Sequence, residues 1–252
     1  MTEFWKIVNK VIRDSDVILL VLDSRLVKET RHPEIEEKVR KTGKPLIYVL
    51  NKCDLVKKEE IEKLKNPLKP AVFISAKDHL GTTKLRECIL IEAKRAKIEF
   101  KTITVGVLGY PNVGKSSIIN AMKGKHSAST SSMSGHTKSL MKIRGDNRIM
   151  FLDTPGVLPY REKDAVKHAF IGTVDFVNEK DPDIMAMKLM AKYPGLIEHH
   201  YQVEPNTDRE EVLEQIAIKK MILKKGKEPD LARTGRMILQ EWQKGKIRPK
   251  DE

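Results

Sequence analysis

Two hydrophobic patterns alternate along the first 155 residues of the chain. Short, continuous apolar runs rich in Val, Ile and Leu are typical of strands that are buried on both faces of a parallel sheet. Such runs are found at 17–22, 46–50, 71–74 and 103–108, and two more at 140–143 and 148–152 flank a turn at 145–147. Helical spacing separates the runs, at 6–13, 33–39, 57–64, 82–97 and 116–122. This alternation predicts an α/β domain with a parallel sheet.

The pattern changes after residue 160. No strand-like alternation follows, and helical spacing is found at 163–170, 183–192, 209–224 and 231–245, with prolines between these segments. A small α-helical domain is therefore predicted, with a boundary that gives domains at 1–160 and 161–252. Apolar residues at helical spacing predict its core: Leu213, Ile216, Ala217, Met221, Met237, Ile238 and Trp242.

The charge of the chain adds a class of partner to this picture. The 252 residues carry a net charge of +13, which favours a polyanion such as nucleic acid. Met1–Gly156 holds 30 Lys and Arg against 18 Asp and Glu, whereas Val157–Glu252 holds 18 against 17. Within the second segment, Ala217–Lys250 holds 11 against 3. The alternative is that these lysines and arginines only form solvated helix faces.

Cysteine usage and hydropathy indicate a cytoplasmic protein. Two cysteines, Cys53 and Cys88, cannot form a disulfide framework and favour a reducing compartment. Charges interrupt the N-terminal residues before an apolar run forms, so we expect no signal peptide. The longest apolar run, at 17–22, is too short to span a bilayer, and no membrane partner is expected.

A phosphate-binding loop follows the strand expected at 103–108. The segment Gly109-x4-Gly114-Lys115-Ser116 matches the P-loop pattern, and it lies between a predicted strand and a predicted helix as that pattern requires. Lys115 is expected to neutralise the β- and γ-phosphates, and the Ser116 hydroxyl to bind Mg²⁺. The phosphate-binding residues predicted here are Asn112, Val113, Gly114, Lys115, Ser116 and Ser117.

Two further motifs select guanine. Asn51-Lys52-Cys53-Asp54 follows the strand at 46–50 and reads as NKxD, and Ser75-Ala76-Lys77 follows the strand at 71–74. The carboxylate of Asp54 can accept hydrogen bonds from guanine N1 and the exocyclic amine, a pairing that adenine cannot make. We expect Asn51 to tie this loop to the P-loop, the Lys52 stem to cover the base and the Ala76 amide to meet the guanine oxygen. The base-binding residues predicted here are Asn51, Lys52, Asp54, Ser75, Ala76 and Lys77.

A DxxG element at 153–156 completes the set. Asp153 ends a predicted strand and is expected to act on Mg²⁺ through water, and the Gly156 amide to contact the γ-phosphate as a switch hinge. In the Ser/Thr-rich segment 126–135 and just after it, Thr137 is the first candidate for a second Mg²⁺ hydroxyl, and Thr130 and Ser134 compete with it. The predicted metal ligands are thus Ser116, Thr137 and Asp153.

The order of these motifs is unusual. An ordinary GTPase runs P-loop, switch I, DxxG, NKxD and SAK, whereas here the last two precede the first three. This order resembles the circularly permuted GTPases of the YlqF/YawG-like ribosome-assembly family, as do the DSDVILLVLDSR and GYPNVGKSS blocks and the tail from Gly226 to Gly245. The resemblance implies binding of GTP and GDP, and GTP hydrolysis coupled to maturation of the large ribosomal subunit. It implies that subunit or its rRNA as partner; we expect no DNA partner and a monomer.

The group that activates water for hydrolysis is left open by the sequence. Val157 stands where many GTPases place a glutamine after DxxG, and it cannot orient a water by hydrogen bonding. Asn112 is a candidate to help hold K⁺ near the phosphates, although a simple turn residue after Pro111 explains it equally well. His32 and His136 are alternative activators, against the simpler interpretation of solvated surface histidines. The predicted catalytic residues are Lys115, Thr137, Gly156 and Asn112.

Two rival functions fit the same motifs. One is a GTPase that serves another RNA, such as tRNA. The other is a GTP-dependent binding switch or scaffold with little hydrolysis, which Val157 would favour.

Overall fold

The computed structural model describes residues 3–57, 59, 63, 68–99, 101–123, 141–145, 147–153 and 180–248. The chain divides into two compact units, Met1–Glu162 and Lys163–Glu252, and each is described by itself. The helix predicted at 163–170, the loop predicted at 126–135 and most of the helix predicted at 57–64 lie outside the described residues.

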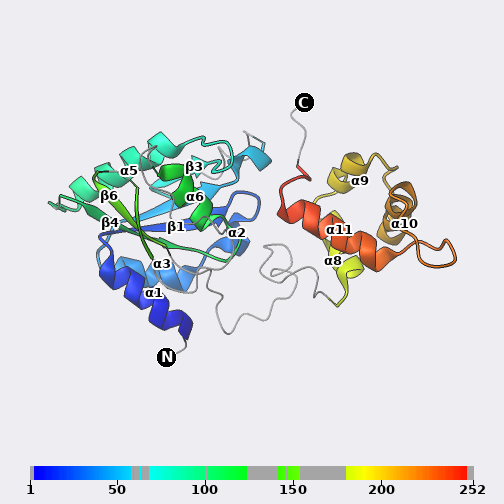
Figure 1. Ribbon diagram of the computed structural model, residues 1–252, viewed down its shortest axis with the longest axis horizontal. Helices are drawn as coiled ribbons and strands as arrows, with labels where there is room; N and C mark the ends of the chain where they lie inside the picture. Colours follow the sequence, from blue (N-terminus) through cyan, green and yellow to red (C-terminus); the bar gives the residue numbers. More distant parts are fainter. Residues whose placement is uncertain are drawn as a thin grey trace. The chain divides into compact units, whose positions relative to one another are not determined.

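A six-stranded sheet forms the centre of the first unit, in the order β3-β2-β1-β4-β6-β5 (Figure 1). The pairs β3–β2, β2–β1, β1–β4 and β4–β6 are parallel, and β5 and β6 form the antiparallel hairpin that the sequence predicts. The strands are β1 Val17–Asp23, β2 Leu46–Asn51, β3 Ala71–Ile74, β4 Ile103–Leu108, β5 Met141–Arg144 and β6 Ile149–Asp153. The predicted α/β domain with a mainly parallel sheet is confirmed.

Strand β1 is central and all seven of its residues are buried. This burial explains its continuous apolar sequence, because each face of the strand is covered and no polar alternation is needed. Its register places Asp23 beside Asn51 of β2 and Leu20 beside Leu108 of β4. The carboxyl ends of five parallel strands therefore share one edge of the sheet, where ligands bind in open α/β folds.

Helices flank this sheet and begin and end where the local sequence allows. Lys44 Nζ donates to the carbonyls of Ile12, Arg13 and Ser15 over 2.7, 2.8 and 2.6 Å, which satisfies acceptors at the end of the first helix. Pro33 opens α3, as its fixed φ favours. The helices of this unit are α1 Glu3–Asp14, α2 Val27–Thr30, α3 Pro33–Lys41, the 3₁₀ turn η1 Cys53–Leu55, α5 Thr82–Arg95 and α6 Lys115–Met122.

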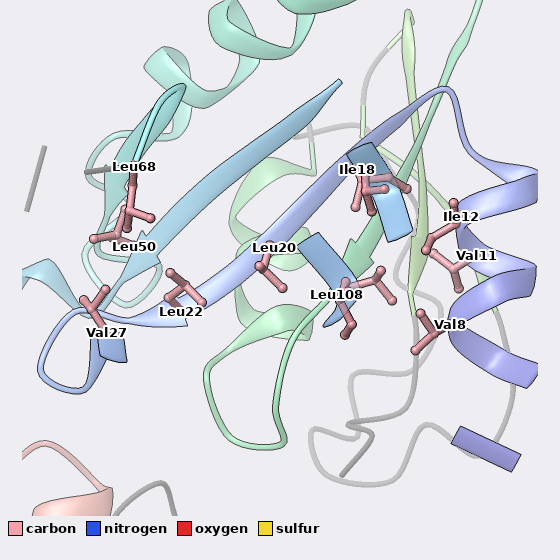
Figure 2. Packing of buried hydrophobic residues seen from close by; sticks show 12 residues of the cluster. Val8, Val11, Ile12, Ile18, Leu20, Leu22, Val27, Leu50, Leu68 and Leu108 are labelled. Carbon is pink, nitrogen blue, oxygen red and sulfur yellow. The ribbon is translucent and has the colours of Figure 1, made fainter. Parts of the chain in front are cut away.

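The hydrophobic core lies between the sheet and the helices. Figure 2 shows side chains of α1 facing the strands, and the same cluster extends along β1 to the far end of the sheet. Each fully buried aliphatic side chain contributes about 1.5–3 kcal/mol to folding. The core members that Figure 2 labels are Val8, Val11, Ile12, Ile18, Leu20, Leu22, Val27, Leu50, Leu68 and Leu108.

The described part of the second unit is helical, as the sequence predicts, with α8 Pro182–Lys192, α9 Leu196–Tyr201, α10 Arg209–Lys219 and α11 Leu231–Gln243. A Cβ on Gly235 of α11 would lie 2.5 Å from the Pro182 carbonyl carbon and 2.6 Å from the Asp183 nitrogen, so glycine allows α11 to approach the start of α8 closely. The Trp242 ring packs 4.9 Å from that of Tyr193. In the described part of the chain, no helix has the length and apolar character needed to cross a membrane.

The second unit differs from the prediction at the ends of α10 and α11, in the unpredicted helix α9 and at one core residue. Helix α10 ends at Lys219 rather than at residue 224, because Met221 adopts a left-handed φ of 56° and the Ile222 amide returns to the Ala217 carbonyl. Met221 is 78% exposed, so its assignment to the core was wrong. The other apolar residues predicted on these helices are buried or half-buried: Leu213, Ile216, Ala217, Met237, Ile238 and Trp242.

Candidate nucleotide-binding site

The predicted motif residues follow the strands that share the carboxyl edge of the sheet. Asn51 is the last residue of β2, Ser75 follows β3, Gly109 follows β4, and Asp153 is the last residue of β6. Because these strands are parallel, the fold brings motif residues as distant in the chain as Asn51 and Asp153 to one edge.

Asn51 joins three of these segments through its side-chain amide. Its Nδ2 donates to the Val113 carbonyl of the P-loop over 2.8 Å, as the sequence predicts for this residue. Its Oδ1 accepts the Ala76 amide over 3.2 Å. With 2% of its surface exposed, Asn51 uses both ends of its amide in low-dielectric surroundings, so NKxD, SAK and the P-loop are held in one frame.

The SAK segment forms a compact loop. Ser75 pairs with Leu80 through two backbone hydrogen bonds of 3.2 and 3.0 Å, and its hydroxyl donates to the Asp78 carboxylate over 2.8 Å. Lys77 is exposed. The Ala76 amide, which the sequence assigns to the guanine oxygen, donates to Asn51 in this structure, so it has a structural partner and its contact with guanine stays a prediction.

The P-loop depends on glycine at two positions. Gly109 has a φ of +149°, and a Cβ there would lie 2.5 Å from the Val21 carbonyl oxygen of β1. Gly114 has a φ of +97°, and a Cβ there would overlap Asn51 Nδ2. Asn112 also adopts a left-handed φ of 60°, which asparagine tolerates better than most residues. The turn role that the sequence allows for Asn112 is thus observed.

Lys115 is buried at the start of α6 with 6% of its surface exposed. Its ammonium donates to the carbonyls of Gly109 and Tyr110 over 2.9 and 2.7 Å, inside the turn of the P-loop. Burial lowers the pKa of Lys115 to about 8, and the Asp153 carboxylate partly opposes this shift. The cation is therefore poorly compensated by the protein alone, and an anion in the loop would stabilise it.

Ser116 and Asp153 lie together beneath the P-loop. The Ser116 hydroxyl donates to Asp153 Oδ2 over 3.1 Å, which brings two of the three predicted metal ligands within hydrogen-bonding distance. Hydroxyl and carboxylate oxygens are hard donors of the kind that Mg²⁺ prefers. Among the described residues, no group of three or more His, Cys, Asp or Glu side chains could hold a metal ion.

A buried ionic cluster lies beside the NKxD loop. Asp23 accepts two hydrogen bonds from the Arg25 guanidinium, and Lys52 Nζ lies 2.8 Å from Asp23 Oδ2. Burial alone would raise the pKa of Asp23, but Arg25 and Lys52 outweigh it and hold the pKa below its usual range. Asp54 lies in η1, half-buried, two residues after Lys52.

A family model described as "50S ribosome-binding GTPase" matches residues 104–224. The match begins in β4, just before the P-loop, whereas the NKxD and SAK segments precede it and follow strands of the same sheet. The fold is that of a P-loop GTPase domain with its motifs in circularly permuted order. The structure also superposes on that of GNP-bound YlqF from T. maritima with a TM-score of 0.66 and 22% identity, covering 97% of this chain and 94% of that one.

Curated relatives of this chain carry GTP-binding names. An uncharacterized GTP-binding protein of Methanocaldococcus jannaschii is 43% identical over 96% of this chain and 65% of its own length. Nucleolar GTP-binding protein 2 of Saccharomyces cerevisiae is 34% identical over 96% of this chain and 52% of its own length. The chain thus spans between about half and two thirds of the length of these relatives.

The remaining predicted site residues divide into two groups. Val113 is buried, and Ser117 is exposed in the first turn of α6. Six others lie outside the described residues: Thr130, Ser134, His136, Thr137, Gly156 and Val157.

His32 is not the solvated histidine that the sequence favours, because only 8% of its surface is exposed. Its ring packs near those of Trp5 and Tyr110, and its Nδ1 accepts the Ile35 amide at the start of α3. Sequence reasoning missed the roles of Asp23 and Arg25; the signal was an aspartate as the last residue of a buried strand, as Asp153 is in β6, with an arginine two residues later.

Proposed function

We propose that the protein binds GTP and GDP at the carboxyl edge of the sheet, hydrolyses GTP to GDP and phosphate, and acts as an assembly factor on the large ribosomal subunit or its rRNA. The observation that carries the nucleotide part is the Asn51 amide, which joins the base-selecting and phosphate-binding segments through bonds to Val113 and Ala76. We place this activity in the cytoplasm and expect a monomer.

For the base, Asp54 would accept the two guanine hydrogens, and the aliphatic stem of Lys52 would cover one face of the ring. The SAK loop, made of Ser75, Ala76 and Lys77, would close the pocket around the guanine oxygen. The Ser75–Asp78 hydrogen bond supports this role, because it fixes the loop that carries the Ala76 amide.

For the phosphates, Lys115 would move its hydrogen bonds from the P-loop carbonyls to the β- and γ-phosphate oxygens. The burial that lowers its pKa to about 8 makes this exchange favourable, since phosphate supplies the negative charge that the carbonyls lack. Amides at the start of α6, from Val113, Gly114, Ser116 and Ser117, would surround the β-phosphate as helix N-termini do.

The cation proposed for this site is Mg²⁺, which the hydroxyl and carboxylate oxygens present would suit. Ser116 would bind the ion directly and Asp153 through water, and their 3.1 Å hydrogen bond supports this assignment. Thr137 is proposed as the second hydroxyl, and the Gly156 amide as the contact with the γ-phosphate. Bound Mg²⁺ would neutralise charge on the β- and γ-phosphate oxygens.

We also propose that K⁺ raises the rate of hydrolysis, through the Asn112 side chain beside the phosphates. A monovalent cation there would supply positive charge as the transition state develops. Turnover is expected to be several-fold faster in KCl than in NaCl at equal ionic strength, measured as released phosphate. Equal rates in the two salts would exclude this role for Asn112.

The second unit offers a surface for RNA in the lysine hairpin, which we define as residues 222–230. Leu223 pairs with Pro229, and backbone hydrogen bonds link Lys224 to Glu228 over 2.8 Å and Asp230 to Ile222 over 3.0 Å. Gly226 turns the chain with a φ of +111°. These bonds hold the turn in a defined shape, which reduces the conformational entropy that an ordered contact would otherwise cost.

Three exposed lysines project from this hairpin, Lys224, Lys225 and Lys227. Next to it Lys219 and Lys220 are exposed, as are the apolar side chains Ile218 and Met221 at 57% and 78%. A cluster of ammonium groups fits the phosphate backbone of folded RNA, and 5% aromatic residues give little basis for stacking on single-stranded bases.

Sedimentation with large ribosomal subunits tests this function. The protein is expected to pellet with the subunits in a non-hydrolysable GTP analogue and to remain mostly in the supernatant with GDP. Replacing Lys224, Lys225 and Lys227 with alanine should weaken the association at least about 10-fold and lower the dependence of log K on log salt by about 2, because fewer counterions are released.

A matched variant controls for net charge. Replacing Lys180, Lys188 and Lys192, three exposed lysines at or near α8, removes the same charge from the same unit and should leave the association nearly unchanged. Equal losses of subunit affinity in both variants would show that the hairpin contributes only nonspecific positive charge. Pelleting independent of nucleotide, or preference for tRNA over the subunit, would favour instead a scaffold with little hydrolysis or a GTPase of another RNA.

A further inference from the structure

Asp23 holds two cations with one buried carboxylate. Its Oδ1 accepts the Arg25 backbone amide and Nε, both over 3.0 Å, and its Oδ2 accepts Arg25 Nη2 and Lys52 Nζ, both over 2.8 Å. The side chains of Asp23 and Arg25 are 2% and 4% exposed. Each carboxylate oxygen thus has two donors, which leaves Asp23 one orientation.

This carboxylate is tied to the NKxD segment by backbone as well as by charge. Asp23 is the register partner of Asn51, and the Ser24 amide donates to the Asn51 carbonyl over 2.8 Å. The end of β1 therefore fixes the residue that precedes Lys52. The same end is further held by the Asp23 amide, which donates to the Thr30 hydroxyl over 3.2 Å.

Lys52 is the residue that needs this support. Its backbone lies in the left-handed region, with φ 60° and ψ 35°, a conformation that a residue with a side chain adopts only when its surroundings impose it. Its side chain is four-fifths buried, and its ammonium group lies 2.8 Å from Asp23 Oδ2. Without that carboxylate the buried cation would move toward water, and the reason for the left-handed turn would be lost.

We propose that Asp23, oriented by Arg25, is a positioning residue for guanine recognition, which holds Lys52 and through it the loop that carries Asp54. The ion pair sets the left-handed turn at Lys52, and this turn directs the chain into η1 so that the Asp54 carboxylate meets the base. This role rests on the proposed function, because it concerns the fit of a guanine nucleotide.

Exchange of Asp23 for asparagine tests the proposal in the full-length chain. Asp23→Asn keeps the size and removes the charge, and we expect the Kd for GDP to rise about 10-fold, equivalent to about 1.4 kcal/mol. Inosine diphosphate (IDP) lacks the exocyclic amine that a well-placed Asp54 would bind. The Kd for IDP divided by the Kd for GDP should therefore fall several-fold in the variant. A purely structural role for Asp23 would weaken both nucleotides equally and leave this ratio unchanged.

Asp16→Asn is the matched control. Asp16 immediately precedes β1 and accepts the Thr104 amide over 2.7 Å, so the change removes one hydrogen-bonded carboxylate near the opposite end of the strand from Asp23. Its nucleotide affinities should match those of the wild type.

A double-mutant cycle shows whether Asp23 acts through Lys52. In a Lys52→Met background, Asp23→Asn should cost little further GDP affinity, because the partner is already absent. If Asp23→Asn does not fold, Arg25→Met is the substitute, because it leaves the Asp23–Lys52 pair in place. This variant is expected to lower the GDP affinity and the ratio of the IDP Kd to the GDP Kd, each by less than is expected for Asp23→Asn. An unchanged ratio in the variants, or full additivity in the cycle, overturns the proposal, whereas failure of the wild type to bind GDP overturns the proposed function instead.

Discussion

Replacing Asp54 with asparagine is expected to weaken GDP binding about 100-fold or more and to create binding of xanthosine diphosphate (XDP). Asp54 accepts two hydrogen bonds from guanine in the proposed site, and a hydrogen bond to a charged group contributes about 1.5–3 kcal/mol. An asparagine amide would face the guanine amine with its own donor. Xanthine carries a carbonyl in place of that amine, so the asparagine amide can donate to it. Titration of fluorescent GDP and XDP measures both effects.

Asp78→Asn is the control for this change. Asp78 is the other carboxylate in the base loops, and it accepts the Ser75 hydroxyl over 2.8 Å. Its replacement loosens the SAK loop and is expected to weaken GDP and XDP binding alike. Retention of GDP preference by the Asp54→Asn variant would show that another group selects the base.

Gly114→Ala is expected to abolish most nucleotide binding, with at least about 100-fold loss of GDP affinity, and to lower the Tm by on the order of 10 °C. The new Cβ would overlap Asn51 Nδ2, and the φ of +97° disfavours any side chain. Relief of the overlap breaks the bond from Asn51 to the Val113 carbonyl, and a buried amide without its partner costs about 1–3 kcal/mol. Thermal melting and GDP titration test the two parts.

Gly43→Ala separates the overlap from the backbone strain. Gly43 has a φ of +69°, and no atom lies within 4 Å of the Cβ that alanine would add. This variant carries a similar strain, so it should lose a few degrees of Tm and keep its affinity for GDP. Normal nucleotide binding by Gly114→Ala would mean that Asn51 does not hold the P-loop in place.

Local pattern was sufficient to predict the frame of the site. The strands 71–74 and 103–108 have the predicted bounds, because continuous apolar runs end sharply at polar or glycine residues there. The tie from Asn51 to the P-loop was predicted as well, since two motifs that follow parallel strands must meet at one edge.

Features that depend on few residues or on distant partners were not predictable. Helices α2 and α9, with four and six residues, are too short to show a helical period. The end of α10 depends on a left-handed turn at Met221, a residue with no preference for that conformation. The link between Asp23 and Lys52 joins positions 29 residues apart, and charge alone does not show which lysine a carboxylate meets.

The sheet order divides the first unit into two halves that are each continuous in the chain. Strands β1 to β3 come from residues 17–74 and strands β4 to β6 from residues 103–153, and the halves meet only where β1 pairs with β4 within the sheet. In the proposed site the base belongs to the first half and the phosphates to the second. A nucleotide that contacts both halves would therefore stabilise the fold, by an amount that grows with its concentration in the cell, as well as setting the state of the switch.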